Sequence, residues 1–162
     1  MDEGKYLIEV SKESVGFCAS HFLVFKSGRR ERIHGHNFKV RAGITSSKTD
    51  CGMVMDFLEL SKELKDVVAP LDYKMLLAGD HDSLEIQNLG KEVIVKTQDG
   101  ERFIFPEDDV CILPIEETTA ECLARYIAEK LHKKLSGVLA MDRFCVSVEE
   151  MEGHSASYML GE

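Results

Sequence analysis

Residues 34–44 are the feature that most restricts how this chain can fold. Their alternate positions are His34, His36, Phe38, Val40, Ala42 and Ile44. Residues two apart on an extended strand point to the same face, so two imidazoles share a face with a row of apolar side chains. The pattern predicts a half-buried strand with two histidines at its start. Two histidines so placed are half of a metal site, and the other ligands must come from elsewhere in the chain.

His21 is the candidate for a third ligand, because it ends another extended segment, residues 15–21. If that segment pairs with the strand that begins at His34, the three imidazoles meet. Three neutral imidazoles with a fourth position open are typical of a catalytic zinc site, whereas a closed structural site wants a fourth protein ligand, commonly cysteine. The alternative is that these are ordinary strand histidines without a metal.

Glu31 lies three residues before His34, in a loop that is otherwise basic. The basic residues of that loop are Lys26, Arg29, Arg30 and Arg32. A carboxylate beside a metal is suited to acid/base catalysis. The arginines either bind an anionic substrate or form a solvated basic surface, and the sequence leaves both interpretations open.

The composition excludes several classes of function. The 162 residues carry 20 basic and 29 acidic side chains, a net charge of −9, which argues against nucleic acid or an anionic membrane as partner. No apolar run approaches the roughly 18 residues that a membrane span needs. The five cysteines have no paired spacing and are expected to be reduced. With an acidic N-terminus, these features predict a single cytoplasmic domain over residues 1–162.

Local patterns predict strands interleaved with two helices. Strands are expected at residues 5–10, 15–21, 34–44, 143–148 and 156–160, with a short apolar stretch at 110–115. A hairpin is predicted at residues 92–105 around Asp99-Gly100. One helix is expected from Asp56 to Pro70, and a second from Thr118 or Thr119 to Gly137, with apolar residues every four positions. The fold class is therefore α+β with a largely antiparallel sheet.

Six motifs, in order and approximate spacing, resemble the 6-pyruvoyl-tetrahydropterin synthase family, which includes 6-carboxy-tetrahydropterin synthase. They lie at residues 17–22, 33–38, 52–57, 71–72, 119–121 and 148–150. The resemblance implies the tunnelling fold (T-fold), an antiparallel four-stranded sheet with two helices on one face, here with an extra β-hairpin. It also implies homo-oligomers, trimers or hexamers, with active sites between subunits. Zinc would be held by His21, His34 and His36, while Glu150 would anchor the pterin ring with help from Thr119.

The sequence departs from the family pattern at the position of the catalytic residue, and this difference bears on which reaction is expected. No cysteine stands between Phe22 and Ile33, where usual members carry a catalytic one, and Glu31 falls on that position. This resembles the branch in which glutamate replaces the cysteine. A carboxylate is already a base at neutral pH, whereas a thiol must first lose its proton. The branch implies that the side chain of 7,8-dihydroneopterin triphosphate is cleaved to give 6-hydroxymethyl-7,8-dihydropterin, a folate precursor.

A second departure affects proton transfer. The family has Asp-His where this chain has Asp72-Tyr73. Asp72 is kept as the supporting acid/base group, but a phenol is a poor base compared with an imidazole. His81, which follows Asp80, is an alternative source of an imidazole.

Three other functions stay open at the level of sequence. The chain could be a 6-carboxy-5,6,7,8-tetrahydropterin synthase of the queuosine pathway, against which the missing cysteine counts, or a 6-pyruvoyl-tetrahydropterin synthase. It could also be a non-catalytic paralogue that binds zinc and pterin, for which Tyr73 is the main support.

Overall fold

The predicted histidine strand forms the centre of the structure. The computed structural model describes residues 4–11, 15–137 and 139–161. β3 (His34–Ser46) is paired antiparallel with β2 (Gly16–His21) on one side and with β9 (Arg143–Met151) on the other. β10 (His154–Gly161) continues the sheet beyond β9, again antiparallel. These strands make the predicted four-stranded antiparallel sheet, and the T-fold expectation is confirmed.

Further strands enlarge this main sheet. β1 (Tyr6–Val10) pairs antiparallel with the C-terminal half of β3. β4 (Lys74–Ala78) and β8 (Val110–Leu113) extend the sheet beyond β2, and both of their pairings are parallel. No strand is predicted at residues 74–78 from the local sequence pattern. Parallel neighbours are joined by a long crossover instead of a turn, so no local turn signal marks their pairing.

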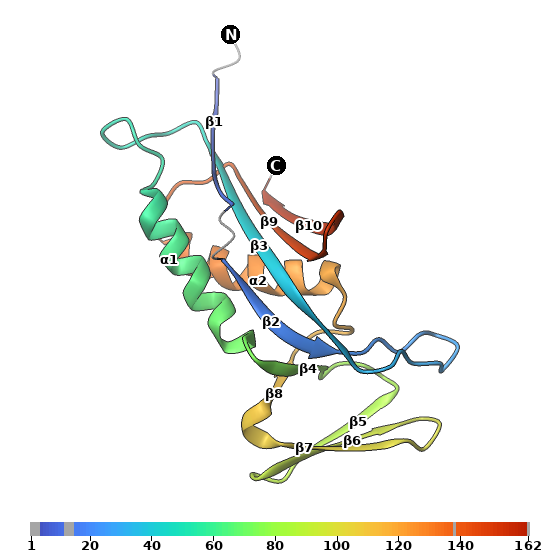
Figure 1. The fold of residues 1–162 in the computed structure, drawn as a ribbon. Helices are drawn as coiled ribbons and strands as arrows, with labels where there is room; N and C mark the ends of the chain where they lie inside the picture. Colours follow the sequence, from blue (N-terminus) through green and yellow to red (C-terminus); the bar gives the residue numbers. More distant parts are fainter. Residues whose placement is uncertain (1–3, 12–14, 138, 162) are drawn as a thin grey trace.

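Both helices lie on one face of the main sheet (Figure 1). α1 (Phe57–Val68) begins at Asp56, whose carboxylate accepts from the amide of Leu58 at 2.7 Å. α2 (Ala120–Leu135) begins at Thr119 and packs against β9 and β10. Pro70 lies in the 3₁₀ turn η1 (Ala69–Leu71) that follows α1. Among the described residues, no helix is long and apolar enough to cross a membrane.

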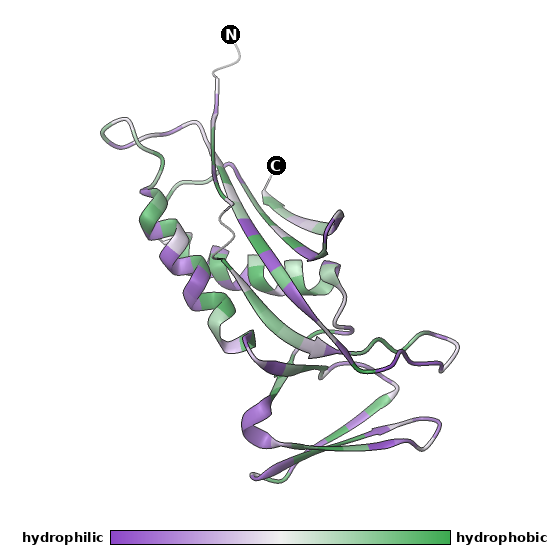
Figure 2. Ribbon diagram, in the orientation of Figure 1, coloured by the Kyte–Doolittle hydropathy of each residue, from purple (hydrophilic) through white to green (hydrophobic). Residues whose placement is uncertain are grey.

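The alternation predicted for β3 separates the core from the open face of the sheet. Phe38, Val40 and Ile44 are at most 1% exposed, whereas Lys39 and Arg41 are exposed on the opposite face. Figure 2 shows this as alternating hydrophilic and hydrophobic bands along β3. The apolar face packs against the helices, where the leucines and isoleucine of α2 are buried at four-residue spacing.

A separate three-stranded sheet, the accessory sheet, fills the crossover between β4 and β8. It consists of β5 (Leu84–Asn88), β6 (Glu92–Thr97) and β7 (Arg102–Pro106), which are antiparallel. The 3₁₀ turn η2 (Glu107–Asp109) leads from β7 into β8. The hairpin predicted at residues 92–105 is confirmed as β6 and β7, and β5 adds a third strand. The accessory sheet packs its own small core against β4 and the segment after β2 (Figure 1).

The main sheet requires glycine at position 16. A Cβ atom added to Gly16 would lie 2.2 Å from the carbonyl oxygen of Phe38, a backbone atom of the paired strand. We expect Gly16→Ala to lower the free energy of unfolding by about 2 kcal/mol, because β2 and β3 must separate to admit a methyl group. Urea denaturation measures this change. Gly137→Ala is the control, since nothing lies within 4 Å of the added atom, and equal losses in the two variants would contradict the expectation.

Candidate metal site

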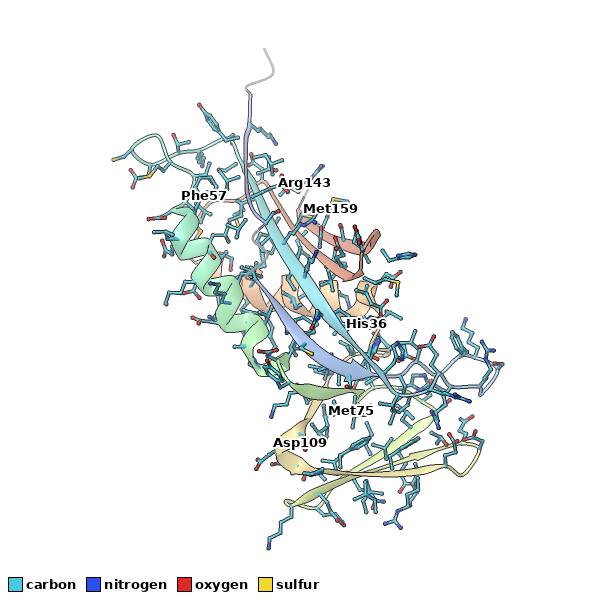
Figure 3. The ribbon with its side chains drawn as sticks, in the orientation of Figure 1. His36, Phe57, Met75, Asp109, Arg143 and Met159 are labelled. Carbon is cyan, nitrogen blue, oxygen red and sulfur yellow. The ribbon has the colours of Figure 1, made fainter. Side chains whose placement is uncertain are left out.

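Pairing of β2 with β3 brings the three predicted histidines together. His21 lies opposite His34 in the register, and His36 is two residues further along the same face of β3. The ring centroids are 4.7 Å apart for His21 and His34, 5.3 Å for His21 and His36, and 4.8 Å for His34 and His36. Figure 3 labels His36 near the start of β3. One ligand atom from each histidine and from Glu150 lies within 4.8 Å of the others.

His21 carries the strongest sign of a ligand. Its side chain is fully buried, and its Nδ1 lies 3.0 Å from the carbonyl oxygen of Thr118. Burial lowers the pKa of His21, so the imidazole is neutral at neutral pH and its single proton lies on Nδ1, where the carbonyl accepts it. Its Nε2 is therefore a bare acceptor, and it has no hydrogen-bond partner among the described residues.

The carboxylate of Glu150 lies against two of the histidines, and its negative charge favours a cation at this position. Its Oε1 lies 3.1 Å from Nε2 of His21 and 3.6 Å from Nε2 of His36. A carboxylate oxygen and an unprotonated ring nitrogen are both acceptors, and two acceptors at that distance repel unless a positive charge lies between or beside them. The lowered pKa of His21 disfavours a proton in that role. The donor set therefore fits a metal ion.

The other two histidines complete the donor set. Nδ1 of His34 lies 2.8 Å from the carbonyl oxygen of Arg32, which leaves its Nε2 free to bind a metal. Backbone carbonyls that accept from the far nitrogen fix the orientation of metal-binding imidazoles. His36 is 15% exposed and turns its Nε2 toward Glu150.

Glu31 is the acidic side chain beside this cluster. Its Oε2 lies 4.0 Å from Nε2 of His34, and its side chain is 36% exposed. The amide of Glu31 donates to the carbonyl of Leu23 at 2.9 Å, which ties the residue to the segment that leaves β2. Glu31 therefore lies beside the histidines, as its position three residues before His34 predicts.

Thr119 and its neighbour Thr118 have different roles. The Thr119 hydroxyl accepts from the amide of Cys122 at 3.3 Å and so caps α2. Thr118 is buried and supplies the carbonyl that holds His21. From the sequence, Thr118 is predicted only as a possible helix cap. Any residue type offers a carbonyl, so no sequence signal could have identified this contact.

Asp72 and Tyr73 lie away from the histidines of the same chain. The Asp72 carboxylate accepts from the amide of Cys18 at 2.8 Å, three residues before His21 and so about 10 Å back along the strand. Tyr73 is 83% exposed and has a φ of 56°, a conformation that is uncommon for residues other than glycine.

His81 is also outside the cluster. Its Nε2 lies 3.1 Å from the carbonyl oxygen of Val24, and its Nδ1 accepts from the amide of Ser83 at 3.0 Å. Both ring nitrogens are therefore engaged with the backbone, and the structure does not bring this imidazole to the histidine cluster.

Curated proteins of similar sequence carry the names of pterin synthases. A Methanocaldococcus jannaschii protein, provisionally named 6-carboxy-5,6,7,8-tetrahydropterin synthase, is 31% identical over 145 residues, which cover 88% of each chain. A Pyrococcus horikoshii protein with the same provisional name is 30% identical over 116 residues, which cover 71% of this chain and 68% of that protein.

Solved structures show the same fold over almost the whole chain. The 6-pyruvoyl tetrahydropterin synthase of Plasmodium falciparum is 27% identical, with a TM-score of 0.90 and coverage of 98% of this chain and 99% of that one. The Plasmodium vivax enzyme gives 0.91 at 24% identity with the same coverage. Residues 9–161 match the family model described as 6-pyruvoyl tetrahydropterin synthase. The chain belongs to the 6-pyruvoyl tetrahydropterin synthase family.

Proposed function

We propose that this protein is a zinc-dependent lyase that cleaves the side chain of 7,8-dihydroneopterin triphosphate to give 6-hydroxymethyl-7,8-dihydropterin. The observation that carries the proposal is the carboxylate of Glu31 beside the histidines, 4.0 Å from Nε2 of His34. Family membership supports a pterin synthase reaction in general. The position and type of this side chain support cleavage as the specific reaction.

Zinc would be held by His21, His34 and His36. Neutral imidazoles with an open position are the donor set of catalytic zinc sites, and the bare Nε2 of His21 fits that use. Bound zinc would make the hydroxyl groups of the substrate side chain more acidic.

Glu31 would act as general base and then as general acid. It takes the proton of the hydroxyl group on C2′, a carbonyl forms there, and the bond between C1′ and C2′ breaks. The electron pair of that bond passes to C1′ and is stabilised by the pterin ring. Glu31 returns the proton to C1′, which becomes the hydroxymethyl group, and the phosphorylated fragment leaves as an aldehyde. The partial exposure of Glu31 gives substrate access to it.

Glu150 would anchor the pterin ring. A carboxylate matches the ring N–H and amino group of a pterin in a bidentate pair. In the structure this side chain turns toward the histidines and is 28% exposed, so it borders the same space as the metal. Thr119, at the start of α2, would contribute its hydroxyl to the ring, because a capping oxygen can still donate its own proton.

Asp72 would serve a site in a neighbouring subunit. Its distance along β2 from His21 separates it from the metal site of its own chain. The resemblance implies homo-oligomers with active sites between subunits, and an exposed Tyr73 beside Asp72 suits such a boundary.

The second candidate reaction is formation of 6-carboxy-5,6,7,8-tetrahydropterin. The names of the archaeal relatives favour it. The product separates the two candidates, because only cleavage yields 6-hydroxymethyl-7,8-dihydropterin.

Zinc binding tests the metal assignment. We expect one zinc ion per chain, and we expect His21→Ala to weaken zinc affinity more than roughly 100-fold, since removal of a direct ligand costs at least as much as removal of its support. Isothermal titration measures the affinity. His154→Ala is the control, because His154 is exposed at the start of β10. Equal affinity in both variants would rule out His21 as a ligand.

Substitution of Glu31 tests the reaction. Zinc-loaded Glu31→Gln should turn over 7,8-dihydroneopterin triphosphate roughly 100-fold more slowly, because the amide cannot accept the hydroxyl proton. Chromatography identifies the product, and Glu152→Gln, at an exposed turn, serves as control. If the wild-type protein gave only the 6-carboxy or 6-pyruvoyl product, the cleavage assignment would fail. If it bound pterin without any turnover, the non-catalytic alternative would hold.

The role of Glu150 has its own test. We expect Glu150→Gln to raise KM roughly tenfold through loss of a charge-assisted pair and to leave the zinc content unchanged. The adjacent Glu149→Gln is the matched control, since Glu149 pairs with Lys39 and Arg41 on the open face of the sheet. Loss of zinc from Glu150→Gln would instead make Glu150 a metal ligand.

A further inference from the structure

The segment that joins His21 to His34, residues 22–33, is here called the bridging loop. Val24 and Arg30 pair across it as an isolated β-bridge, and the amide of Glu31 donates to the carbonyl of Leu23. The loop thus folds back on itself before β3 begins. Glu31 lies at the point where the returning half of the loop approaches the histidines.

Arg30 connects this loop to the accessory sheet. Its Nε and Nη2 donate to the two carboxylate oxygens of Glu101, and the Nη2 contact is 3.0 Å. The guanidinium lies 4.7 Å from the ring centroid of Phe103 and 5.8 Å from that of Phe22. A bidentate pair combined with aromatic stacking fixes a guanidinium more firmly than either contact alone.

The same guanidinium also holds the backbone of Glu31. Nη1 of Arg30 donates to the carbonyl oxygen of Glu31 at 2.6 Å. The carboxylate of Glu101 neutralises the charge of Arg30, and the Arg30 side chain is only 18% exposed. Arg30 is therefore engaged inside the protein, in contrast to the exposed Arg29 and Arg32 of the same loop.

Two further side chains support the outgoing half of the loop, one from the crossover and one from the segment between β8 and α2. His81, just before β5, contacts the carbonyl of Val24 at 3.1 Å, and Glu117 accepts from the amide of Val24 at 2.8 Å. Val24 is the bridge partner of Arg30. Both halves of the bridging loop are thus held by residues that follow β4, and none of these residues belongs to the histidine cluster.

We propose that the accessory sheet positions the base of the reaction, with Glu101 and Phe103 holding Arg30, and Arg30 holding Glu31. This inference rests on the proposed role of Glu31. Arg30 and Glu101 are positioning residues, because they act on the reaction only through the placement of Glu31. The bond from Arg30 joins the Glu31 carbonyl, so loosening it displaces the main chain that carries the carboxylate.

Glu101→Gln tests the proposal, with Glu85→Gln as matched control. Glu85 lies on the same accessory sheet and pairs with Lys96 at 3.2 Å, away from Arg30. In the zinc-loaded protein, Glu101→Gln should lower kcat roughly tenfold with little change in KM or zinc content, because small misplacement of a catalytic group is costly. Glu85→Gln should keep the wild-type rate. Equal rates for the two variants would overturn the proposal.

A double variant separates positioning from general damage. In the Glu31→Gln background, Glu101→Gln should lower the residual rate no further, because the group that it positions is already absent. A further tenfold loss in that background would show that Glu101 acts elsewhere and would overturn the proposal.

Hydrogen exchange gives a readout that does not depend on turnover. The amide of Glu31 should exchange at least about threefold faster in Glu101→Gln than in Glu85→Gln, since its bond to Leu23 opens more often. Unchanged exchange would contradict the positioning role even if activity fell. If Glu31→Gln retained full activity while this exchange still accelerated, the proposed function would fail and the structural link would stand.

Discussion

The antiparallel register between β2 and β3 is the constraint on which the site depends. It places His21 opposite His34 and leaves His36 on the same face. A slip of one residue would turn His21 to the open face of the sheet, because side chains alternate along a strand. The buried residues Phe17 and Phe38, whose rings stack at 4.8 Å, lie in the same register and oppose such a slip. The same register between β2 and β3 therefore determines both the packing of the core and the meeting of the three histidines.

Sequence alone reached the histidine cluster because its geometry is local and periodic. Alternation put His34 and His36 on one face of β3, and pairing of neighbouring strands brought His21 to them. The caps of both helices and the hairpin of β6 and β7 were predictable for the same reason, since turns and caps are short-range chemistry. The fold class followed from these elements.

Contacts between distant segments could not be predicted in the same way. Arg30 and Glu101 are 71 residues apart, and each looks like an ordinary surface charge in the sequence. The parallel pairing of β4 with β8 and the support of His21 by the Thr118 carbonyl have no local pattern either. The turn of Glu150 toward the imidazoles depends on the pairing of β9 with β3. These features required the folded chain.

The crossover that contains the accessory sheet leaves the main sheet after Ala78 and re-enters it at Val110, which lies opposite Met75. The chain beyond Ala78 then runs beside the C-terminal end of β8. The amide of Gly79 donates to the carbonyl of Leu113 at 2.7 Å, and the amide of Asp80 donates to that of Ile115 at 3.1 Å. Both ends of the crossover are held by the pairing of β4 with β8. The length of the crossover can therefore change at little entropic cost, because loop-closure entropy rises only slowly with length. Changes in the accessory sheet can therefore alter how the bridging loop is held, while β2 and β3, which carry the histidines, keep their positions.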